Sequence, residues 1–205
     1  ETWADDHGAY KTGGASLWVT GSFDPESNLT LWGTGNPVPM FDPEFRPGDN
    51  LYSNSTVAMD ADTGEIAWYF QYTPGAYLDY DEVGSHLLYD VEINGESRKV
   101  LGHFGRNGFY YNLDRNTGAF LNSGQYLEEV DWVEGIDPKT GKPIGYDSSK
   151  LLQEYIPGSA PRRGQPAIEA CPHLQGGVNF WPTAYNPILQ IAYGASFEGC
   201  FSVVP

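Results

Sequence analysis

Apolar residues recur along this chain in short alternating runs separated by turn residues. Residues 29–32 (LTLW) form one such run, and its period of two predicts a strand. Helical periodicity is almost absent: we expect helix only at residues 148–155 and in a single turn from residue 128. The chain contains 25 Gly and 15 Pro, which favours many short strands joined by turns. The pattern therefore predicts an all-β fold.

A repeated turn motif extends this prediction. The pattern Asp-x-x-Thr-Gly begins at Asp60, Asp114 and Asp137, each time between two strand-like runs. We expect the Asp carboxylate to accept backbone N–H groups at the turn, and the Gly to adopt the positive φ that closes a hairpin. A weaker repeat relates residues 23–33 to residues 185–194. Repeated antiparallel hairpins with recurring aromatic residues predict a β-propeller.

The length of the chain indicates how much of a propeller it holds. A blade takes roughly 40–50 residues, so this chain corresponds to about four blades. No shift in composition marks a boundary, so we expect one domain over residues 1–205. The chain begins at Glu1 without an initiator Met and ends directly after an apolar run. We therefore expect an arc of a larger ring.

Composition narrows the possible partners. Hydrophobic residues make up 40% of the chain, enough for a packed core. The formal net charge of -16 argues against nucleic acid, whose phosphates select basic surfaces, and against an anionic membrane surface. No apolar run approaches the ~20 residues of a membrane span. Cys171 and Cys200 are compatible with one disulfide or with two buried free thiols.

Two stretches carry the oxygen ligands that a hard cation prefers. In residues 32–37 (WGTGNP), two glycines allow close backbone approach, and Asn36 places an amide oxygen after a predicted strand. Asp79 and Asp81 are two apart, so an extended backbone points both carboxylates to one face. Together these three residues could bind a metal ion. The alternatives are an ordinary Gly-rich hairpin end and a solvated acidic loop, which Glu82 extends.

Three further residues could contact a ligand. Arg106 offers a fork of donors to carbonyl or carboxylate oxygens, although an Arg at a hairpin turn is the simpler interpretation. Trp18 follows a loop of small residues and could stack on a planar ligand or pack in the core. Asn179 could donate to a ligand or shape a turn. The four His show no metal-ligand spacing, so we interpret them as structural or surface residues.

Taken together, these stretches resemble the quinoprotein alcohol dehydrogenases of the methanol and ethanol type, which use pyrroloquinoline quinone (PQQ). The resemblance covers nearly the whole chain. The matching stretches are residues 1–3 (ETW), 11–14 (KTGG), 32–37 (WGTGNP), 46–52 (RPGDNLY), 79–81 (DYD), 106–109 (RNGF) and 171–172 (CP). The resemblance implies an eight-bladed propeller with the quinone in its central funnel, of which this chain is a middle portion.

The resemblance implies the catalytic and metal-binding roles. Asn36 matches the metal-binding asparagine, Asp79 the catalytic aspartate at the metal, and Arg106 the arginine that bonds the quinone oxygens. Asp81 stands where calcium-dependent members usually have a small or neutral residue and lanthanide-dependent members have an aspartate. Because one more carboxylate better neutralises a trivalent ion, we expect a lanthanide, with calcium as the alternative.

Other positions match residues around the cofactor. Trp18 matches the tryptophan that stacks on PQQ, and Ser16 stands where the family often has a threonine that touches it. Asn179 matches a polar residue near the cofactor. Cys171 and Cys200 match a disulfide of the family, which implies a periplasmic location.

The sequence also departs from the family near the expected funnel. Leu78 stands where a tryptophan is common, Gly75 and Ala76 replace a typical His-Asp pair, and Gly105 replaces the usual Asp. These departures put methanol in doubt as the substrate and allow a larger alcohol.

The expected reaction is oxidation of a primary alcohol to an aldehyde with metal-bound PQQ. Asp79 would act as general base, and Arg106 would stabilise negative charge on the quinone oxygen. The resemblance implies a cytochrome c as electron acceptor and a homodimer as the full-length protein. One alternative is a non-catalytic propeller scaffold, which has no reason to bring Asn36, Asp79 and Arg106 together. Another is a soluble sugar dehydrogenase that uses the same quinone.

Overall fold

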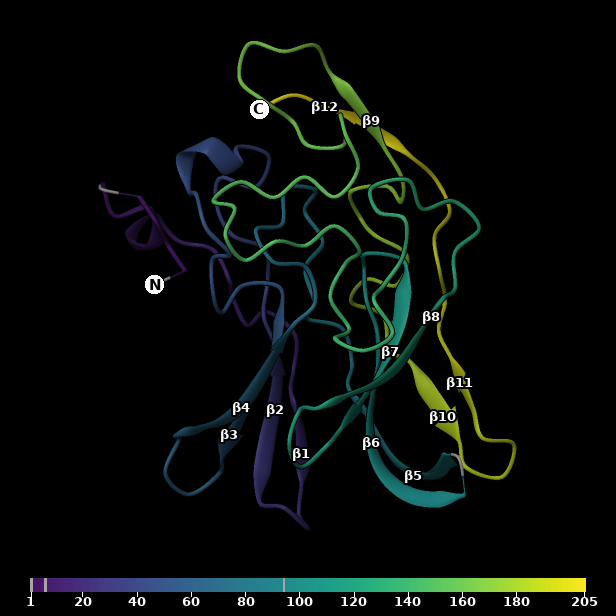
Figure 1. The fold of residues 1–205 in the computed structure, drawn as a ribbon. Coiled ribbons are helices and arrows are strands. Elements are labelled where there is room, and N and C mark those ends of the chain that lie inside the picture. The colour runs from purple at the N-terminus through teal and green to yellow at the C-terminus, as the bar shows by residue number, and fades with distance from the viewer. Residues whose placement is uncertain (1, 6, 94) are drawn as a thin grey trace.

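The computed structural model describes residues 2–5, 7–93 and 95–205. Glu1, which belongs to one of the stretches that resemble quinoproteins, lies outside the described residues. Within them the chain forms strands and two short 3-10 turns, at Ala9–Thr12 and Pro43–Phe45 (Figure 1). The all-β prediction is confirmed.

Two antiparallel four-stranded sheets contain most of the strands. The first sheet consists of β1 (Ser22–Asp24), β2 (Leu29–Gly33), β3 (Ser55–Asp60) and β4 (Ile66–Gln71). The second consists of β5 (Leu87–Ile93), β6 (Glu96–Phe104), β7 (Phe109–Asp114) and β8 (Phe120–Gln125). Each sheet is a meander in which strands pair with their neighbours in the chain. In β2 burial alternates along the strand, and Leu29 and Leu31 enter the core, as the period of two predicted.

Two smaller sheets complete the described fold. β10 (Ala184–Asn186) and β11 (Ile191–Tyr193) form a hairpin that repeats the β1–β2 hairpin, and β9 (Ile168–Ala170) pairs with β12 (Phe201–Val203). β5 contacts both β1 and β10, so the first strands of three successive sheets lie side by side (Figure 1). This is how blades are arranged around a propeller axis, and the predicted fold class is confirmed.

The Asp-x-x-Thr-Gly turns are built alike. Oδ1 of Asp60 accepts the backbone N–H groups of Asp62 and Thr63, at 3.0 and 2.8 Å. Asp114 and Asp137 hold their turns in the same way. The glycine of each turn has a φ between 70° and 74°. The first two turns join β3 to β4 and β7 to β8, so the predicted hairpin chemistry is confirmed.

The predicted helices are wrong. Residues 127 and 128 form a bend, and residues 148–155 form turns and bends without helix. The side chain of Gln153 is 1% exposed, and its Nε2 donates to the carbonyls of Asp147 and Lys150, at 2.9 and 3.1 Å. A buried side-chain amide therefore satisfies backbone carbonyls locally, which competes with the regular hydrogen bonds of a helix.

Aromatic side chains join the connection after β8 to the loop between β4 and β5. The rings of Trp132 and Tyr155 meet edge to face with centroids 5.3 Å apart, and Tyr80 lies 6.0 Å from Trp132. All three are buried in the core. Because each ring buries a large apolar area, this cluster supports the loop that precedes β5.

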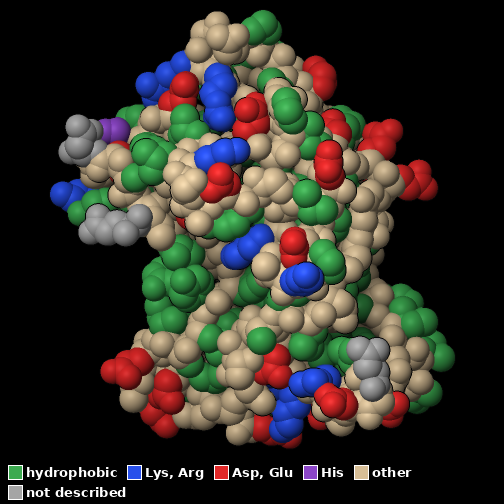
Figure 2. All heavy atoms as spheres, in the orientation of Figure 1, with side chains coloured by type: hydrophobic (Ala, Val, Ile, Leu, Met, Phe, Trp, Pro, Cys, Tyr) green, Lys and Arg blue, Asp and Glu red, His purple; other side chains and the backbone are tan. Residues whose placement is uncertain are grey.

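Charged side chains of both signs are interspersed on the surface. Figure 2 shows Asp and Glu side chains at both ends of one face, with Lys and Arg side chains among them. Arg115 is an exception, because it is only 6% exposed and lies 3.0 Å from both Asp24 and Glu26 and 3.3 Å from Asp90. It joins the turn after β7 to the turn after β1.

Candidate functional site

The candidate residues all lie in connections at one end of the sheets. Because the strands of each meander alternate in direction, the connections after β2, β4 and β6 emerge at the same end, opposite the hairpin turns that begin at Asp60 and Asp114 (Figure 1). The candidates are distributed over the chain as follows: Ser16 and Trp18 before β1, Asn36 after β2, Asp79 and Asp81 after β4, Arg106 after β6, and Asn179 before β10. The topology thus collects residues that are far apart in the sequence.

Glycines let the Asn36 loop pack closely against its neighbours. A Cβ on Gly33 would lie 2.0 Å from the carbonyl oxygen of Glu82, so only glycine fits there. Gly35 donates its N–H to the carbonyl of Ser16 at 3.1 Å. The segment that carries Ser16 is therefore held beside the Asn36 loop.

The segment with Asp79 and Asp81 is buried and irregular. Asp79 has a φ of 63°, in the left-handed region, so the extended backbone that we predicted is wrong here. Leu78 and Tyr80 are each 1% exposed and anchor the segment on both sides. Asp81 is 6% exposed, which contradicts a solvated acidic loop.

The Asp81 carboxylate joins three of the candidate segments. Its Oδ1 accepts the backbone N–H of Asn36 at 2.6 Å, and its Oδ2 accepts the indole N–H of Trp18 at 2.6 Å. Nη1 of Arg106 lies 3.4 Å from Oδ2. A carboxylate has about four lone-pair sites, so Asp81 retains acceptor capacity for a cation.

Arg106 and Asn179 share a backbone acceptor. Nε of Arg106 donates to the carbonyl of Gln175 at 3.1 Å, and Nη2 donates to Leu174 at 2.6 Å. Nδ2 of Asn179 donates to the same Gln175 carbonyl at 2.6 Å. Arg106 does lie at a hairpin turn, but its buried side chain extends to Asp81. Asn179 shapes the turn that receives it.

The pKa of the Asp79 carboxyl is shifted from its usual value. Burial raises the pKa of Asp79 to about 6, the neighbouring Asp81 charge adds to the rise, and Arg106 opposes it. Within the described part of the chain, no hydrogen bond reaches this carboxylate or the Oδ1 of Asn36. The Asp79 carboxylate and the Asn36 amide oxygen, which have no hydrogen-bond partner among the described residues, thus accompany the Asp81 carboxylate.

Trp18 presents its ring at the surface of the site. The residue is 45% exposed, and its ring centroid lies 6.4 Å from that of Phe180 at a tilt of 56°. The alternative of a core tryptophan is therefore wrong. Because Asp81 holds the indole by its N–H, an open ring face is available for stacking.

A buried pair beside the site escaped the sequence analysis. Glu82 is fully buried and its Oε2 lies 2.8 Å from Nε2 of His103 on β6. Burial raises the pKa of Glu82 well above its usual range and lowers that of His103 to about 3, so burial favours the neutral form of each group. His86 stacks on His103 with centroids 4.9 Å apart. These two His are structural, as interpreted, but nothing in the sequence indicated the Glu82 partner.

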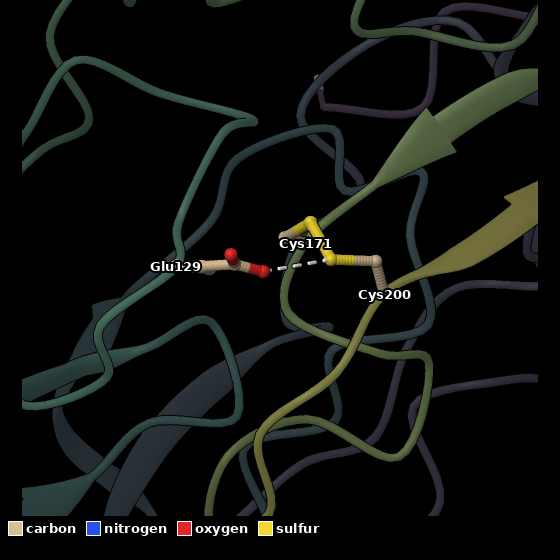
Figure 3. A group of neighbouring side chains, drawn as sticks. All are labelled: Glu129, Cys171 and Cys200. Carbon is tan, nitrogen blue, oxygen red and sulfur yellow. Dashed lines mark hydrogen bonds between the residues drawn. A yellow bond between two sulfur atoms is a disulfide. The ribbon is translucent and has the colours of Figure 1, made fainter.

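Cys171 and Cys200 form a disulfide, as the resemblance implied. Oε2 of Glu129 lies 3.3 Å from Sγ of Cys200, and the three side chains form a compact group (Figure 3). Because the two sulfur atoms are bonded to each other, the group lacks the thiolates that would make it a metal centre.

The fold and the site together define a class of protein: a β-propeller whose connections at one end place a buried and a partly buried carboxylate beside an arginine. Residues 1–123 match the protein family described as "PQQ: Glucose/ethanol/alcohol dehydrogenase, beta-propeller domain". The chain belongs to this family of PQQ-dependent dehydrogenases.

Three relatives show the extent of the similarity. The chain is 39% identical to the quinoprotein alcohol dehydrogenase PedH of Pseudomonas putida over 97% of its own length and 32% of that protein. It superposes on the quinohemoprotein alcohol dehydrogenase of Comamonas testosteroni with a TM-score of 0.85 and 34% identity, over 99% of this chain and 29% of that one. A europium-containing methanol dehydrogenase gives a TM-score of 0.81 and 32% identity, over 93% of this chain and 31% of that one. The chain thus spans about a third of the length of these relatives.

Among the described residues, no helix has the length and apolar character needed to cross a membrane.

Proposed function

We propose that this chain is part of an enzyme that oxidises a primary alcohol to an aldehyde with metal-bound PQQ. The observation that carries the proposal is the Asp81 carboxylate, which holds Trp18, the Asn36 loop and Arg106 together beside Asp79. Asp81 is buried and Asp79 is partly buried beside it; holding two neighbouring carboxylates in this way is costly without a cation or a function, and a propeller scaffold requires neither. Because the chain spans a third of its relatives, the proposal concerns a full-length protein that contains it.

The donor set fits a hard metal ion. Asn36, Asp79 and Asp81 would hold it through an amide oxygen and two carboxylates. A cation would offset the burial that raises the pKa of Asp79, and it would occupy oxygens that have no partner among the described residues. The second carboxylate favours a trivalent lanthanide over calcium, in line with the relative that contains europium. Calcium is the alternative.

Four residues would bind the quinone. Trp18 offers a ring face for stacking, and Ser16 lies exposed on the segment beside the Asn36 loop. Arg106, fixed by two backbone carbonyls, keeps N–H groups for the quinone oxygens, and Asn179 is tied to the same turn. When bound, PQQ supplies the redox chemistry and the metal polarises its carbonyl.

Asp79 and Arg106 would act directly in catalysis. With a pKa of about 6, Asp79 is ionised at neutral pH and can accept the proton of the alcohol hydroxyl. Arg106 is held in one orientation before the reaction, so it stabilises developing negative charge without reorganisation.

The surroundings of the enzyme follow from its relatives and from the disulfide. A disulfide is typical of an oxidising compartment, and the periplasm suits a bacterial quinoprotein. A cytochrome c as acceptor and a homodimer remain predictions from the family. The acidic composition argues against nucleic acid as a partner.

The test is alcohol oxidation by the full-length protein, stripped of metal and reconstituted with PQQ and either lanthanum or calcium. We expect lanthanum to restore dye reduction and Asp81→Ala to abolish that restoration. Asp62→Ala, an exposed carboxylate in the turn after β3, serves as the control and should retain full activity.

Each other outcome has a definite meaning. Calcium-restored activity that survives Asp81→Ala would leave Asp81 as a positioning residue for Trp18 and Arg106. Absence of activity with either metal, across a range of primary alcohols, would refute the enzyme and favour the scaffold. We expect the 205-residue chain alone to be inactive.

A further inference from the structure

The segment between the Asn36 loop and β3 connects the two segments that carry the proposed metal ligands, one with Asn36 and the other with Asp79 and Asp81. Two buried residues of the stretch 46–54 (RPGDNLYSN), Arg46 and Asn54, each contact both of them: Arg46 through its side chain, and Asn54 through its backbone N–H and its side chain. Neither side chain belongs to the candidate ligand set. We infer that they are positioning residues of the metal site, an inference that rests on the proposed function.

Asn54 forms the link closest to the ligands. Its backbone N–H donates to the carbonyl of Gly35 at 3.0 Å, and its Nδ2 donates to the carbonyl of Tyr80. Gly35 directly precedes Asn36, while Tyr80 stands between the two aspartates. One fully buried residue therefore joins both segments within one position of the ligands.

Arg46 forms a second link, three positions away from the ligands. Its Nη2 donates to the carbonyls of Met40 and Ala76, at 2.8 and 2.6 Å, and its Nε donates to Pro39 at 2.8 Å. Its Nη1 donates to Oδ1 of Asn50 at 2.7 Å, so the guanidinium cannot rotate away. Pro39 lies three residues after Asn36, and Ala76 lies three residues before Asp79.

The chemistry of Arg46 supports positioning rather than charge pairing. The side chain is 1% exposed and forms no ion pair with any described residue, although burial lowers its pKa only to about 9 and leaves it charged at neutral pH. Its guanidinium donates hydrogen bonds to four neutral oxygen atoms that belong to three chain segments. A rigid planar fork suits this task, whereas a lysine ammonium does not reproduce its geometry.

The two links fix how far apart the ligands stand before the metal arrives. Asp81 accepts the backbone N–H of Asn36, but it repels Asp79, and Asp79 has no hydrogen bond among the described residues. The contacts among the candidate ligand residues therefore leave the place of Asp79 undefined. Outer partners of metal ligands typically contribute 10–100-fold to metal affinity. We expect an effect of that size from either link.

The experiment measures terbium binding by the full-length protein with PQQ, through luminescence sensitised by aromatic side chains. Asn54→Gly removes the side chain and keeps the left-handed backbone, since Asn54 has a φ of 50°. Its matched control is Asn28→Gly, at a φ of 56° in the turn between β1 and β2, at the opposite end of the sheet. We expect Asn54→Gly to raise the terbium Kd by about 10–100-fold and to shorten the emission lifetime, because looser ligands admit more water. Asn28→Gly should change neither.

To separate an effect on stability from an effect on ligand positioning, terbium binding is measured well below the melting temperature of every variant. A loss of stability alone leaves the Kd and lifetime of the folded protein unchanged, so equal values for Asn54→Gly and Asn28→Gly would overturn the inference. If Asn54→Gly does not fold, the terbium Kd and lifetime of Arg46→Lys are compared with those of Arg115→Lys. Arg115 is the control because it is also a buried arginine but lies in the turn after β7, at the opposite end of the sheets. Equal values for these two variants would then overturn the inference. Failure of terbium to bind the unsubstituted protein would instead refute the proposed metal site.

Discussion

Replacing Asp79 with asparagine should make the metal-free chain more stable while removing its proposed catalytic base. Burial raises the pKa of Asp79 from 3.8 to about 6 in the folded state, so folding favours the protonated carboxyl. The unfolded chain loses this proton first as the pH rises, and the free energy of unfolding therefore falls between about pH 4 and pH 6. The asparagine side chain of Asp79→Asn would be neutral throughout and would tolerate the φ of 63°.

The size of the effect follows from the pKa values. A shift of about two units corresponds to about 3 kcal/mol at most, since one unit is worth about 1.36 kcal/mol. Asp79 is only partly buried, so water screens part of this cost, and we expect roughly 1–2 kcal/mol above pH 6. Below about pH 4 the carboxyl is protonated in both states, and the advantage of Asp79→Asn should disappear.

The assay is urea denaturation of the metal-free 205-residue chain and of Asp79→Asn at several pH values from about 3.5 to 7.5. Only the difference between the two proteins is interpreted, because other carboxylates contribute equally to both. A difference that is constant with pH would refute the reasoning, since the backbone preference of asparagine is independent of pH. Bound lanthanum should reverse the order at pH 7, because Asp79→Asn removes a ligand and the metal stabilises only the folded state that binds it.

Two further predictions concern stability. Gly118→Ala should destabilise the protein more than Gly64→Ala, although both glycines occupy the same turn position. Each substitution costs about 1–2 kcal/mol because alanine disfavours the left-handed backbone. In addition, a Cβ on Gly118 would lie 2.4 Å from the Trp68 ring, whereas Gly64 faces open space. Equal urea midpoints for the two variants would contradict this. Replacing Cys171 and Cys200 with serine should cost about 3–4 kcal/mol, because the disulfide closes a loop with a sequence separation of 29. A melting temperature unchanged from that of the unsubstituted protein would show that the unfolded chain gains little freedom from this loop.

The features that the sequence predicted correctly depend on short-range chemistry. The turns at Asp60 and Asp114 are determined by one carboxylate and one glycine within five residues, so their hairpins can be identified without knowledge of the rest of the fold. Alternation of apolar residues similarly predicted β2. The site residues were identified through the resemblance, which summarises contacts that no local pattern contains.

The features that the sequence did not predict depend on contacts between distant segments. The left-handed φ of Asp79 is tolerated because Leu78 and Tyr80 are anchored in the core on either side. The helix expected at residues 148–155 does not form because the Gln153 amide satisfies the local carbonyls. Asn54 belongs to a stretch whose sequence is typical of an ordinary polar loop, and its contacts with Gly35 and Tyr80 appear only in the folded chain.

The hairpin turns and the candidate site lie at opposite ends of the sheets, so the chain can be modified at one end without altering the other. β6 contains nine residues, so it spans roughly 30 Å between its two ends. The exposed turn at Asn116 lies at one end and the loops of the candidate site at the other. An anchoring peptide or a reporter domain inserted at this turn would orient the molecule on a surface with the loops of the candidate site facing the solution.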